Sequence, residues 1–309
     1  MGYKSDIDKV TRISGTDEFP AVILIDNLNA CNLRCSMCDH KNMSKYRPIQ
    51  KMAFDLYKKL VDEISMMKPE ARVWEIFFGD PFLCNDMAAR VKYAKEKGLK
   101  DVVLNTNGVL MTRGKAKAII QAGLDAMYVG IDAATEETYD KIRIGGDFNK
   151  TVKNVLDYRN LLVHYGNGKQ KLFVQFVVSD INEHETDDFR RFWKMEGVDV
   201  KIRPKVSWAG LVEAANLQDN QKVERKPCYW LMSVINICAG GEVALCSVDV
   251  HCRVPCGNVK EKSIKEVWAD QLKKYRAMQR EGRYTELPDM CRKCSDWQST
   301  YAEFFECKE

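Results

Sequence analysis

The sequence predicts an α/β fold, a partial (β/α)6 TIM barrel followed by a small cysteine-rich C-terminal extension. Three observations predict it. Short apolar runs alternate with segments in which apolar residues recur at helical spacing. Glycines such as Gly98 and Gly123 follow the helical segments, where they can end a helix. The twelve cysteines gather mainly in two groups, one near residue 35 and one after residue 227.

The alternation runs from residue 21 to residue 202 and contains six strand–helix units. Strands are expected at 21–25, 73–78, 102–104, 126–131, 172–178 and 198–202. Helices are expected at 54–67, 86–97, 115–122, 135–142, 148–165 and 187–196. A polar stretch at 216–225 precedes Pro227 and predicts a boundary. We therefore expect a lead-in over 1–20, a barrel over 21–215 and an extension over 216–309.

Composition excludes several functional classes. The chain has 309 residues, of which 45% are hydrophobic, so it is long and apolar enough to bury a core. The sequence contains no run of 18 apolar residues, so we expect no membrane-spanning helix. The first 20 residues lack the apolar core of a secretory signal. The 48 basic and 44 acidic residues are interspersed, which predicts neither a nucleic-acid nor a membrane partner. We expect a cytoplasmic protein with reduced thiols.

The first cysteine group has the spacing C-x3-C-x2-C and follows an apolar run. It comprises Cys31, Cys35 and Cys38. Three thiolates on one loop can bind three irons of a cubic iron–sulfur cluster and leave the fourth iron open. Zinc is the alternative, because His40 lies close enough in the sequence to complete four ligands.

This motif after a first strand resembles the signature of the radical S-adenosylmethionine (SAM) superfamily. The resemblance implies a [4Fe-4S] cluster whose open iron binds the amino and carboxylate groups of SAM. It also implies a flavodoxin- or ferredoxin-type reductant and a 5′-deoxyadenosyl radical as the reactive species. The family usually has an aromatic residue before the third cysteine, where this chain has Met37.

The resemblance also suggests SAM contacts at the strand ends. Gly79 and Asp80 stand where the family has Gly-Gly-Glu-Pro, although an ordinary Gly-Asp-Pro turn is the alternative. Arg143 would bind the SAM carboxylate, and an exposed helix arginine is the alternative. The full set of implied cofactor contacts is Met37, Gly79, Asp80, Asn105, Asn107, Asp132, Arg143 and Gln175.

The C-terminal cysteines resemble the ligands of the twitch or SPASM extension of radical SAM enzymes. This resemblance implies one auxiliary [4Fe-4S] cluster, and a closed zinc site is the alternative. A hairpin at 235–237 and 243–245 and a helix at 263–278 capped by Ser263 would support it. The spacing is similar to that of aminocyclitol dehydrogenases of antibiotic biosynthesis. The implied ligands are Cys228, Cys246, Cys291 and Cys294.

The predicted reaction is hydrogen abstraction from an unactivated carbon of a sugar or aminocyclitol. We expect epimerisation, in which Cys252, Cys256 or Cys238 returns a hydrogen atom, since these cysteines are not needed as ligands. Dehydrogenation with electron transfer to the auxiliary cluster and modification of a ribosomal peptide are the enzymatic alternatives. A non-catalytic iron–sulfur or zinc protein is the alternative from another class. Asp249 and His251 could contact substrate hydroxyl or amino groups.

Overall fold

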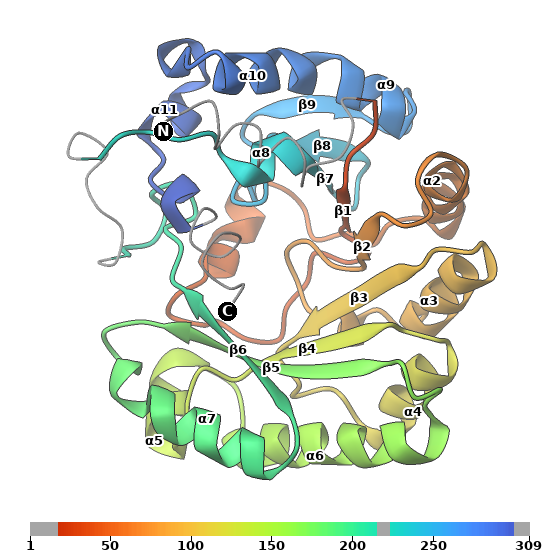
Figure 1. Ribbon diagram of the computed structural model, residues 1–309, viewed down its shortest axis with the longest axis vertical. Helices are drawn as coiled ribbons and strands as arrows, with labels where there is room; N and C mark the ends of the chain where they lie inside the picture. The colour runs from red at the N-terminus through yellow and green to blue at the C-terminus, as the bar shows by residue number, and fades with distance from the viewer. Residues whose placement is uncertain (1–17, 215–222, 300–309) are drawn as a thin grey trace, which may run out of the picture.

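The computed structural model describes residues 18–214 and 223–299, and its centre is a parallel sheet flanked by helices (Figure 1). Six strands follow one another in the sheet and pair in parallel throughout. They are β1 (Val22–Ile25), β2 (Arg72–Trp74), β3 (Asp101–Thr106), β4 (Ala126–Gly130), β5 (Lys171–Val178) and β6 (Asp199–Pro204). The predicted α/β class with a parallel sheet is confirmed.

Helices connect these strands and bury their apolar faces against the outer side of the sheet. They are α2 (Phe54–Met67), α3 (Met87–Glu96), α4 (Arg113–Gln121), α5 (Glu136–Ile142), α6 (Phe148–Tyr165) and α7 (Thr186–Met195). Tyr57, Val91, Ile119, Val155 and Phe189 are fully or almost fully buried in this layer. The inner side of the sheet is thereby left to form the site.

The C-terminal region extends the same sheet. Helix α8 (Tyr229–Ser233) leads into β7 (Val234–Ile237), which pairs in parallel with β1. Strand β8 (Glu242–Ala244) pairs antiparallel with β7 as a hairpin, and β9 (Pro255–Asn258) pairs antiparallel with β8 at the edge of the sheet. The sheet therefore has nine strands in the order β6-β5-β4-β3-β2-β1-β7-β8-β9. The predicted hairpin is confirmed, and its first strand joins the barrel sheet directly.

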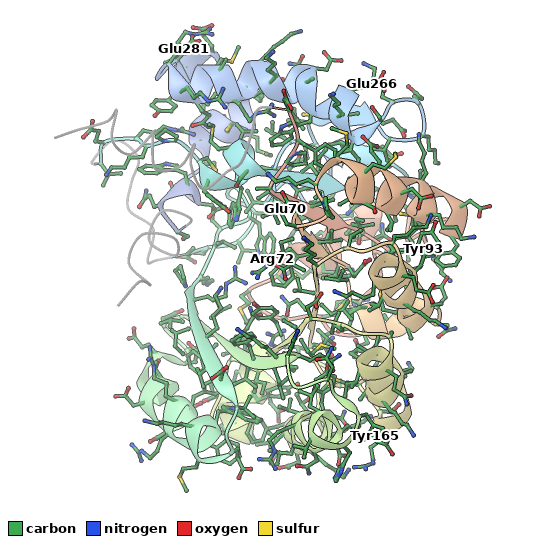
Figure 2. The ribbon with its side chains drawn as sticks, turned by 45° about the vertical axis from the view of Figure 1, so that its right-hand side comes forward. Glu70, Arg72, Tyr93, Tyr165, Glu266 and Glu281 are labelled. Carbon is green, nitrogen blue, oxygen red and sulfur yellow. The ribbon has the colours of Figure 1, made fainter. Side chains whose placement is uncertain are left out.

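The helix expected at 263–278 is two helices. Ser263 caps α9 (Ile264–Ala269) through a capping box with Glu266, as predicted. The chain then breaks at Asp270, whose ψ of −116° is not helical, and resumes as α10 (Gln271–Arg280). Helix α11 (Asp289–Lys293) follows and contains Cys291, and Cys294 comes directly after it. Figure 2 labels Glu266 on α9 and Glu281 just beyond α10.

Strand β2 is shorter than predicted, because the chain leaves the sheet after Trp74. The Glu75 side chain accepts hydrogen bonds from Tyr57 Oη at 2.6 Å and from Asn27 Nδ2 at 2.7 Å, in the interior. The following residues run beside the loop after β1, and the Asp80 amide donates to the Ala30 carbonyl. This path brings Gly79 and Asp80 against the cysteine loop.

None of the helices within residues 18–214 and 223–299 combines the length and apolar character needed to cross a lipid bilayer.

Candidate active site

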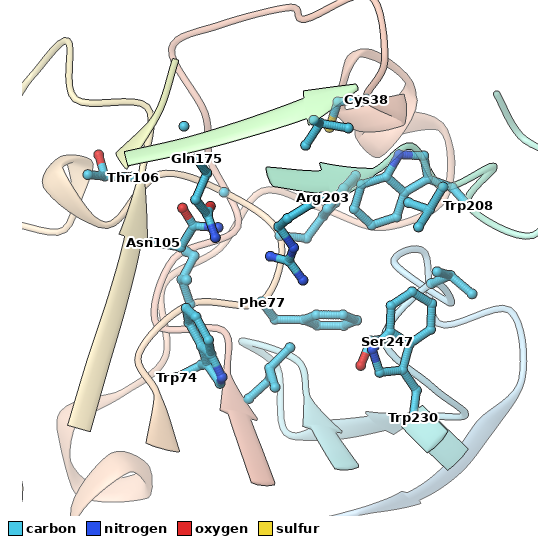
Figure 3. A pocket seen from close by; sticks show the side chains of 18 of the residues that line it. Cys38, Trp74, Phe77, Asn105, Thr106, Gln175, Arg203, Trp208, Trp230 and Ser247 are labelled. Carbon is cyan, nitrogen blue, oxygen red and sulfur yellow. The ribbon is translucent and has the colours of Figure 1, made fainter. Parts of the chain in front are cut away.

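A cavity of about 640 Å³ opens on the inner side of the sheet. It reaches from the loop after β1 to the amino ends of β2 and β3, where Arg72 and Asp101 line it. Figure 3 shows part of the cavity from close by. Every cysteine of the first group and every cofactor contact implied by the sequence lines this cavity. They are Cys31, Cys35, Cys38, Met37, Gly79, Asp80, Asn105, Asn107, Asp132, Arg143 and Gln175. The contacts of the last eight with SAM remain predictions.

The three cysteines of the loop after β1 lie close together and face hydrogen-bond donors. The Leu33 amide lies 3.5 Å from Cys31 Sγ, and Arg143 Nη1 lies 3.7 Å from Cys35 Sγ. Burial raises the pKa of Cys38 to about 12, so its thiolate needs a bound positive group. Such converging thiols with N–H donors around the sulfurs fit an iron–sulfur cluster. His40 also lines the cavity, and its Nε2 contacts the Asn29 carbonyl at 2.9 Å.

Gly79 lets two loops pack backbone against backbone. A Cβ at this position would lie 2.5 Å from the Leu28 carbonyl oxygen and 2.6 Å from that of Ala30. The neighbouring Asp80 carboxylate is buried and accepts three hydrogen bonds from within the protein. The donors are the amides of Phe82 and Asn107 and the Thr106 hydroxyl, at 2.8–3.0 Å. Asp80 therefore fixes the end of β3 beside the cysteine loop.

Asp132 and Arg143 form a buried ion pair at the end of β4. Asp132 takes a φ of 60°, and its Oδ1 accepts a hydrogen bond from the Val177 amide on β5. The Arg143 side chain is 15% exposed and crosses Gly130, where any Cβ would overlap its guanidinium. Arg143 is thus held between Asp132 and Cys35, and the alternative of an exposed helix arginine is wrong. A cation fixed beside the cluster loop suits a carboxylate ligand.

The four C-terminal cysteines lie around a second, small cavity of about 10 Å³. Cys228, Cys246, Cys291 and Cys294 all line it. Burial raises the pKa of Cys291 to about 12, and the other three thiols shift in the same direction for the same reason. Donors surround these sulfurs too, among them the Asp296 amide 3.3 Å from Cys294 Sγ and Gln279 Nε2 3.9 Å from Cys291 Sγ. Four buried thiols with N–H donors fit a second iron–sulfur cluster.

No three Cys, His, Asp or Glu side chains in the described ranges converge as the ligands of a single metal ion would. In a four-iron cluster the ligands are instead spread over separate irons.

The two cavities share a wall. Trp230 and Val248 line both of them, and Ser247, the residue after Cys246, lines the larger one. Figure 3 shows Trp230 and Ser247 at the side of the large cavity, facing Phe77. A group bound by the four C-terminal cysteines would therefore be separated from a molecule in the large cavity by single side chains.

Comparison with known families agrees with this geometry. Residues 28–191, more than half of the chain, match the model of the radical SAM superfamily. The chain belongs to this superfamily. Residues 228–295 match the SPASM model, described as an iron-sulfur cluster-binding domain. The protein is thus a radical SAM enzyme that uses SAM and a [4Fe-4S] cluster, with further iron–sulfur binding in its SPASM domain. The zinc alternative for the first site is wrong.

Curated relatives share the barrel but not the whole length. The GTP 3′,8-cyclase of Limosilactobacillus fermentum is 29% identical over 182 residues, 58% of this chain and 52% of the relative. The 7,8-dihydro-6-hydroxymethylpterin dimethyltransferase of Methanocaldococcus jannaschii is 27% identical over 207 residues, 64% of this chain and 38% of the relative. The chain spans about half or less of the length of these relatives.

Solved structures share the fold over nearly the whole chain. BtrN in complex with AdoMet and 2-DOIA has a TM-score of 0.62 at 18% identity, covering 90% of this chain and 94% of that one. SuiB of Streptococcus suis bound to the precursor peptide SuiA has a TM-score of 0.70 at 12% identity, covering 89% and 70%. At 18% and 12% sequence identity, these similarities show a shared fold only.

The three cysteines considered as hydrogen donors in this radical SAM enzyme lie outside the lining of the large cavity. Cys238 is buried against Cys252, and the thiol of Cys256 points to the Val254 carbonyl at 3.4 Å. Cys238 directly follows β7, Cys252 lies between β8 and β9, and Cys256 lies on β9. The hypothesis that one of them returns hydrogen to a substrate has no support from this geometry.

Asp249 and His251 are also buried in the SPASM domain and do not line the large cavity. The Asp249 carboxylate accepts from the amides of Leu245, Arg253 and Val254, which holds the ligand-bearing loop in shape. His251 contacts Asp39. The expectation that both could meet a sugar is therefore not supported, since neither residue lines the large cavity.

Sequence reasoning missed most of the cavity lining beyond the implied cofactor contacts. Trp74, Phe77 and Trp230 give it aromatic walls, while Lys201 and Arg203 bring positive charge from β6. The strand itself carried the signal, because Lys201 and Arg203 are two residues apart and must face the same side of a sheet. The aromatic residues had no comparable signal, since a strand tryptophan is as common in a core.

Proposed function

We propose that this radical SAM enzyme dehydrogenates a secondary alcohol carbon of a small hydroxylated substrate such as a sugar or aminocyclitol. The bound cofactors would supply a 5′-deoxyadenosyl radical that abstracts the hydrogen atom and an auxiliary cluster that accepts the electron left behind. The substrate then loses one hydrogen atom, one electron and one hydroxyl proton, and becomes a ketone. A flavodoxin- or ferredoxin-type protein is the reductant we expect for the first cluster.

One observation carries this proposal over epimerisation. The wall shared through Trp230 and Val248 places the SPASM cysteines beside the large cavity, whereas Cys238, Cys252 and Cys256 lie outside it. An electron can cross a single side-chain layer, but a hydrogen atom returned from a thiol needs direct contact with the substrate carbon.

The residues of the chain have defined tasks in this reaction. Arg143, held by Asp132, would orient the carboxylate of SAM next to Cys35. The aromatic side chains of Trp74, Phe77 and Trp230 line the cavity and would exclude water from a bound substrate. The hydrogen-bonding side chains Asn105 and Gln175, two of the implied SAM contacts, line the same cavity.

The test is the fate of hydrogen in heavy water. The reconstituted enzyme is incubated anaerobically with SAM, dithionite and a panel of sugars, sugar acids, sugar phosphates and 2-DOIA. We expect a product lighter than its substrate by two hydrogen atoms, without deuterium at carbon. A product of unchanged composition with one solvent deuterium at carbon would instead establish an epimerase.

A cysteine variant sharpens this test. Cys252→Ala should still form the oxidised product, because Cys252 does not reach the cavity. Cys84→Ala is the matched control, since Cys84 is a buried thiol that lines neither cavity and contacts Asp86. Loss of turnover in Cys252→Ala alone would revive the hydrogen-donor hypothesis. Adding precursor-like peptides to the panel tests the peptide alternative in the same assay.

A further inference from the structure

The turn that follows β6 has a strained backbone conformation. Trp208, Ala209 and Gly210 take φ values of 52°, 54° and 84°, so three successive residues lie in the left-handed region. Glycine occupies this region without a steric cost, but two of these three residues carry a Cβ. Such a conformation persists where surrounding contacts hold it in place. The contacts that hold this turn come from a residue that follows α11.

That residue is Asp296, whose side chain is fully buried. Its Oδ1 accepts a hydrogen bond from the Ser207 amide at 2.5 Å, and its Oδ2 accepts one from the Ala209 amide at 2.7 Å. Hydrogen bonds from backbone amides to a carboxylate are among the strong ones. Asp296 lies two residues after Cys294, so the turn is fastened to the segment that carries a SPASM cysteine.

Trp208 connects the turn to the loop of the first cysteine group. Its Nε1 donates a hydrogen bond to the Met37 carbonyl at 2.9 Å, and its ring meets that of Phe78 edge to face with 5.4 Å between centroids. Trp208 and Met37 both line the large cavity, and Figure 3 shows Trp208 on the same side of it as Cys38. Because Met37 stands between Cys35 and Cys38, this hydrogen bond holds the cysteine loop itself.

Different parts of the chain hold successive residues of this loop. The Ser36 amide donates to the Ile142 carbonyl at the end of α5, at 2.9 Å, which ties the loop to the barrel. The next residue, Met37, is held by Trp208, and Asp296 holds the turn that presents this tryptophan. A change at Asp296 should therefore loosen the Met37 end of the loop and leave the tie to α5 intact.

We propose that Asp296 is a positioning residue for SAM binding, which keeps Trp208 on the Met37 carbonyl and the cysteine loop in the conformation that accepts SAM. When only a fraction of molecules has the binding conformation, the apparent affinity falls in proportion to that fraction. Asp296 acts through the loop, since it does not itself line the large cavity. The proposal rests on membership of the radical SAM superfamily and does not depend on which reaction follows SAM cleavage.

The experiment measures the affinity for SAM. Equilibrium dialysis of the anaerobic, unreduced holoenzyme with SAM compares the wild type with Asp296→Asn and Trp208→Phe. Asp296→Asn keeps one acceptor oxygen but presents an NH2 group to the other backbone N–H. Trp208→Phe keeps an aromatic ring but has no donor for the Met37 carbonyl. We expect each variant to bind SAM about tenfold or more weakly and to retain about eight irons per chain.

Two substitutions serve as matched controls. Asp289→Asn changes an exposed acid two residues before Cys291, just as Asp296 lies two residues after Cys294. Trp268→Phe removes a buried indole N–H that has no hydrogen-bond partner within the described residues, at a position outside both cavities. Both control variants should bind SAM as tightly as the wild type does.

Low-temperature EPR of the reduced enzyme adds a readout that a loss of stability alone would not change. At a SAM concentration near the wild-type Kd, the first-cluster signal of Asp296→Asn and Trp208→Phe should resemble the signal without SAM. At saturating SAM it should match that of the wild type, because the loop then has its binding conformation in all molecules.

Wild-type affinity in Trp208→Phe would overturn the proposal, because this variant removes the hydrogen bond to Met37 directly. Wild-type affinity in Asp296→Asn would remove Asp296 from it. Loss of iron from Asp296→Asn would also overturn it, since Asp296 would then serve the SPASM cysteines and not SAM. If both variants bind SAM weakly but the wild type forms no oxidised product, only the dehydrogenation proposal is contradicted.

Discussion

His251 and Asp39 lie 212 positions apart in the sequence and meet in a buried contact of 2.6 Å between Nε2 and Oδ2. Asp39 directly follows the cluster cysteine Cys38, and His251 belongs to the SPASM loop after Cys246. Tyr46 stacks on the His251 ring with 4.1 Å between ring centroids. The SPASM domain thus holds the end of the first cluster loop in place.

We expect a double-mutant cycle to detect this contact. Asp39→Asn and His251→Gln should each lower the anaerobic Tm by about 4–10 °C, because each leaves a buried polar partner poorly matched. The double variant should lose less than the sum, since the pair is already broken in either single variant. Strictly additive losses would mean that the contact contributes nothing of its own.

Gly130→Ala should weaken SAM binding about tenfold or more, because the added Cβ displaces the guanidinium of Arg143. Equilibrium dialysis of the reconstituted enzyme with SAM gives the affinity. Gly114→Ala is the control, since Gly114 lies in α4 with open space around its Cα and its variant should bind SAM normally. An unchanged affinity in Gly130→Ala would remove Arg143 from the SAM site.

Glu75 should make stability depend on pH in the opposite sense to an ordinary salt-bridged acid. Burial raises the pKa of Glu75 from 4.5 to about 7. The folded protein therefore holds a proton that the unfolded chain releases above its ordinary pKa. This contribution is complete below pH 4.5 and is lost as the pH rises through about 7, on the order of 3 kcal/mol in all.

Glu75→Gln should abolish that part of the profile and keep the hydrogen bonds. A neutral amide can donate to Tyr57 Oη, which donates to the Arg90 carbonyl at 2.9 Å, and can accept from Asn27. Thermal melts at several pH values between 4.5 and 7.5 should show the wild type losing Tm relative to the variant. Parallel profiles would show that Glu75 is already ionised across this range.

Replacing two SPASM ligands should remove one cluster and spare the other. In Cys228→Ala/Cys246→Ala we expect iron to fall from about eight to about four per chain. The first cluster should still cleave SAM, because its cysteines lie in a different cavity.

Iron analysis, with 5′-deoxyadenosine measured by chromatography, checks this. Cys84→Ala/Cys256→Ala is the control for loss of two buried thiols that line neither cavity, and it should keep full iron. Full iron in the ligand variant would refute the assignment.

The parts of the fold that rest on local periodicity were predictable. Strand–helix alternation and the glycine stops placed the barrel elements within a few residues, and Ser263 marked a helix start because a capping box is a local signal. The end of β2 was not predictable, because it depends on contacts between residues that are distant in sequence. Glu75 contacts Asn27 and Tyr57, and Gly79 packs against the loop after β1.

Some features of the candidate site were likewise predictable from the sequence, and others were not. The cysteine spacings indicated which thiols gather at each cavity, and their roles as cluster ligands remain predictions. The roles of His251, Asp249 and Cys252 were not accessible, because the side to which a loop residue points is set by long-range packing. The basic face of β6 lies between these cases, since its spacing was visible but its approach to Gln175 was not.

The parallel pairing of β7 with β1 has a consequence for engineering the molecule. In a chain shortened to the barrel alone, β1 would lose its backbone partners on the side that pairs with β7, from Val22 to Ile25. An unpaired strand edge of this kind is a template for aggregation. The barrel and the SPASM domain should accordingly resist being separated or exchanged as independent modules.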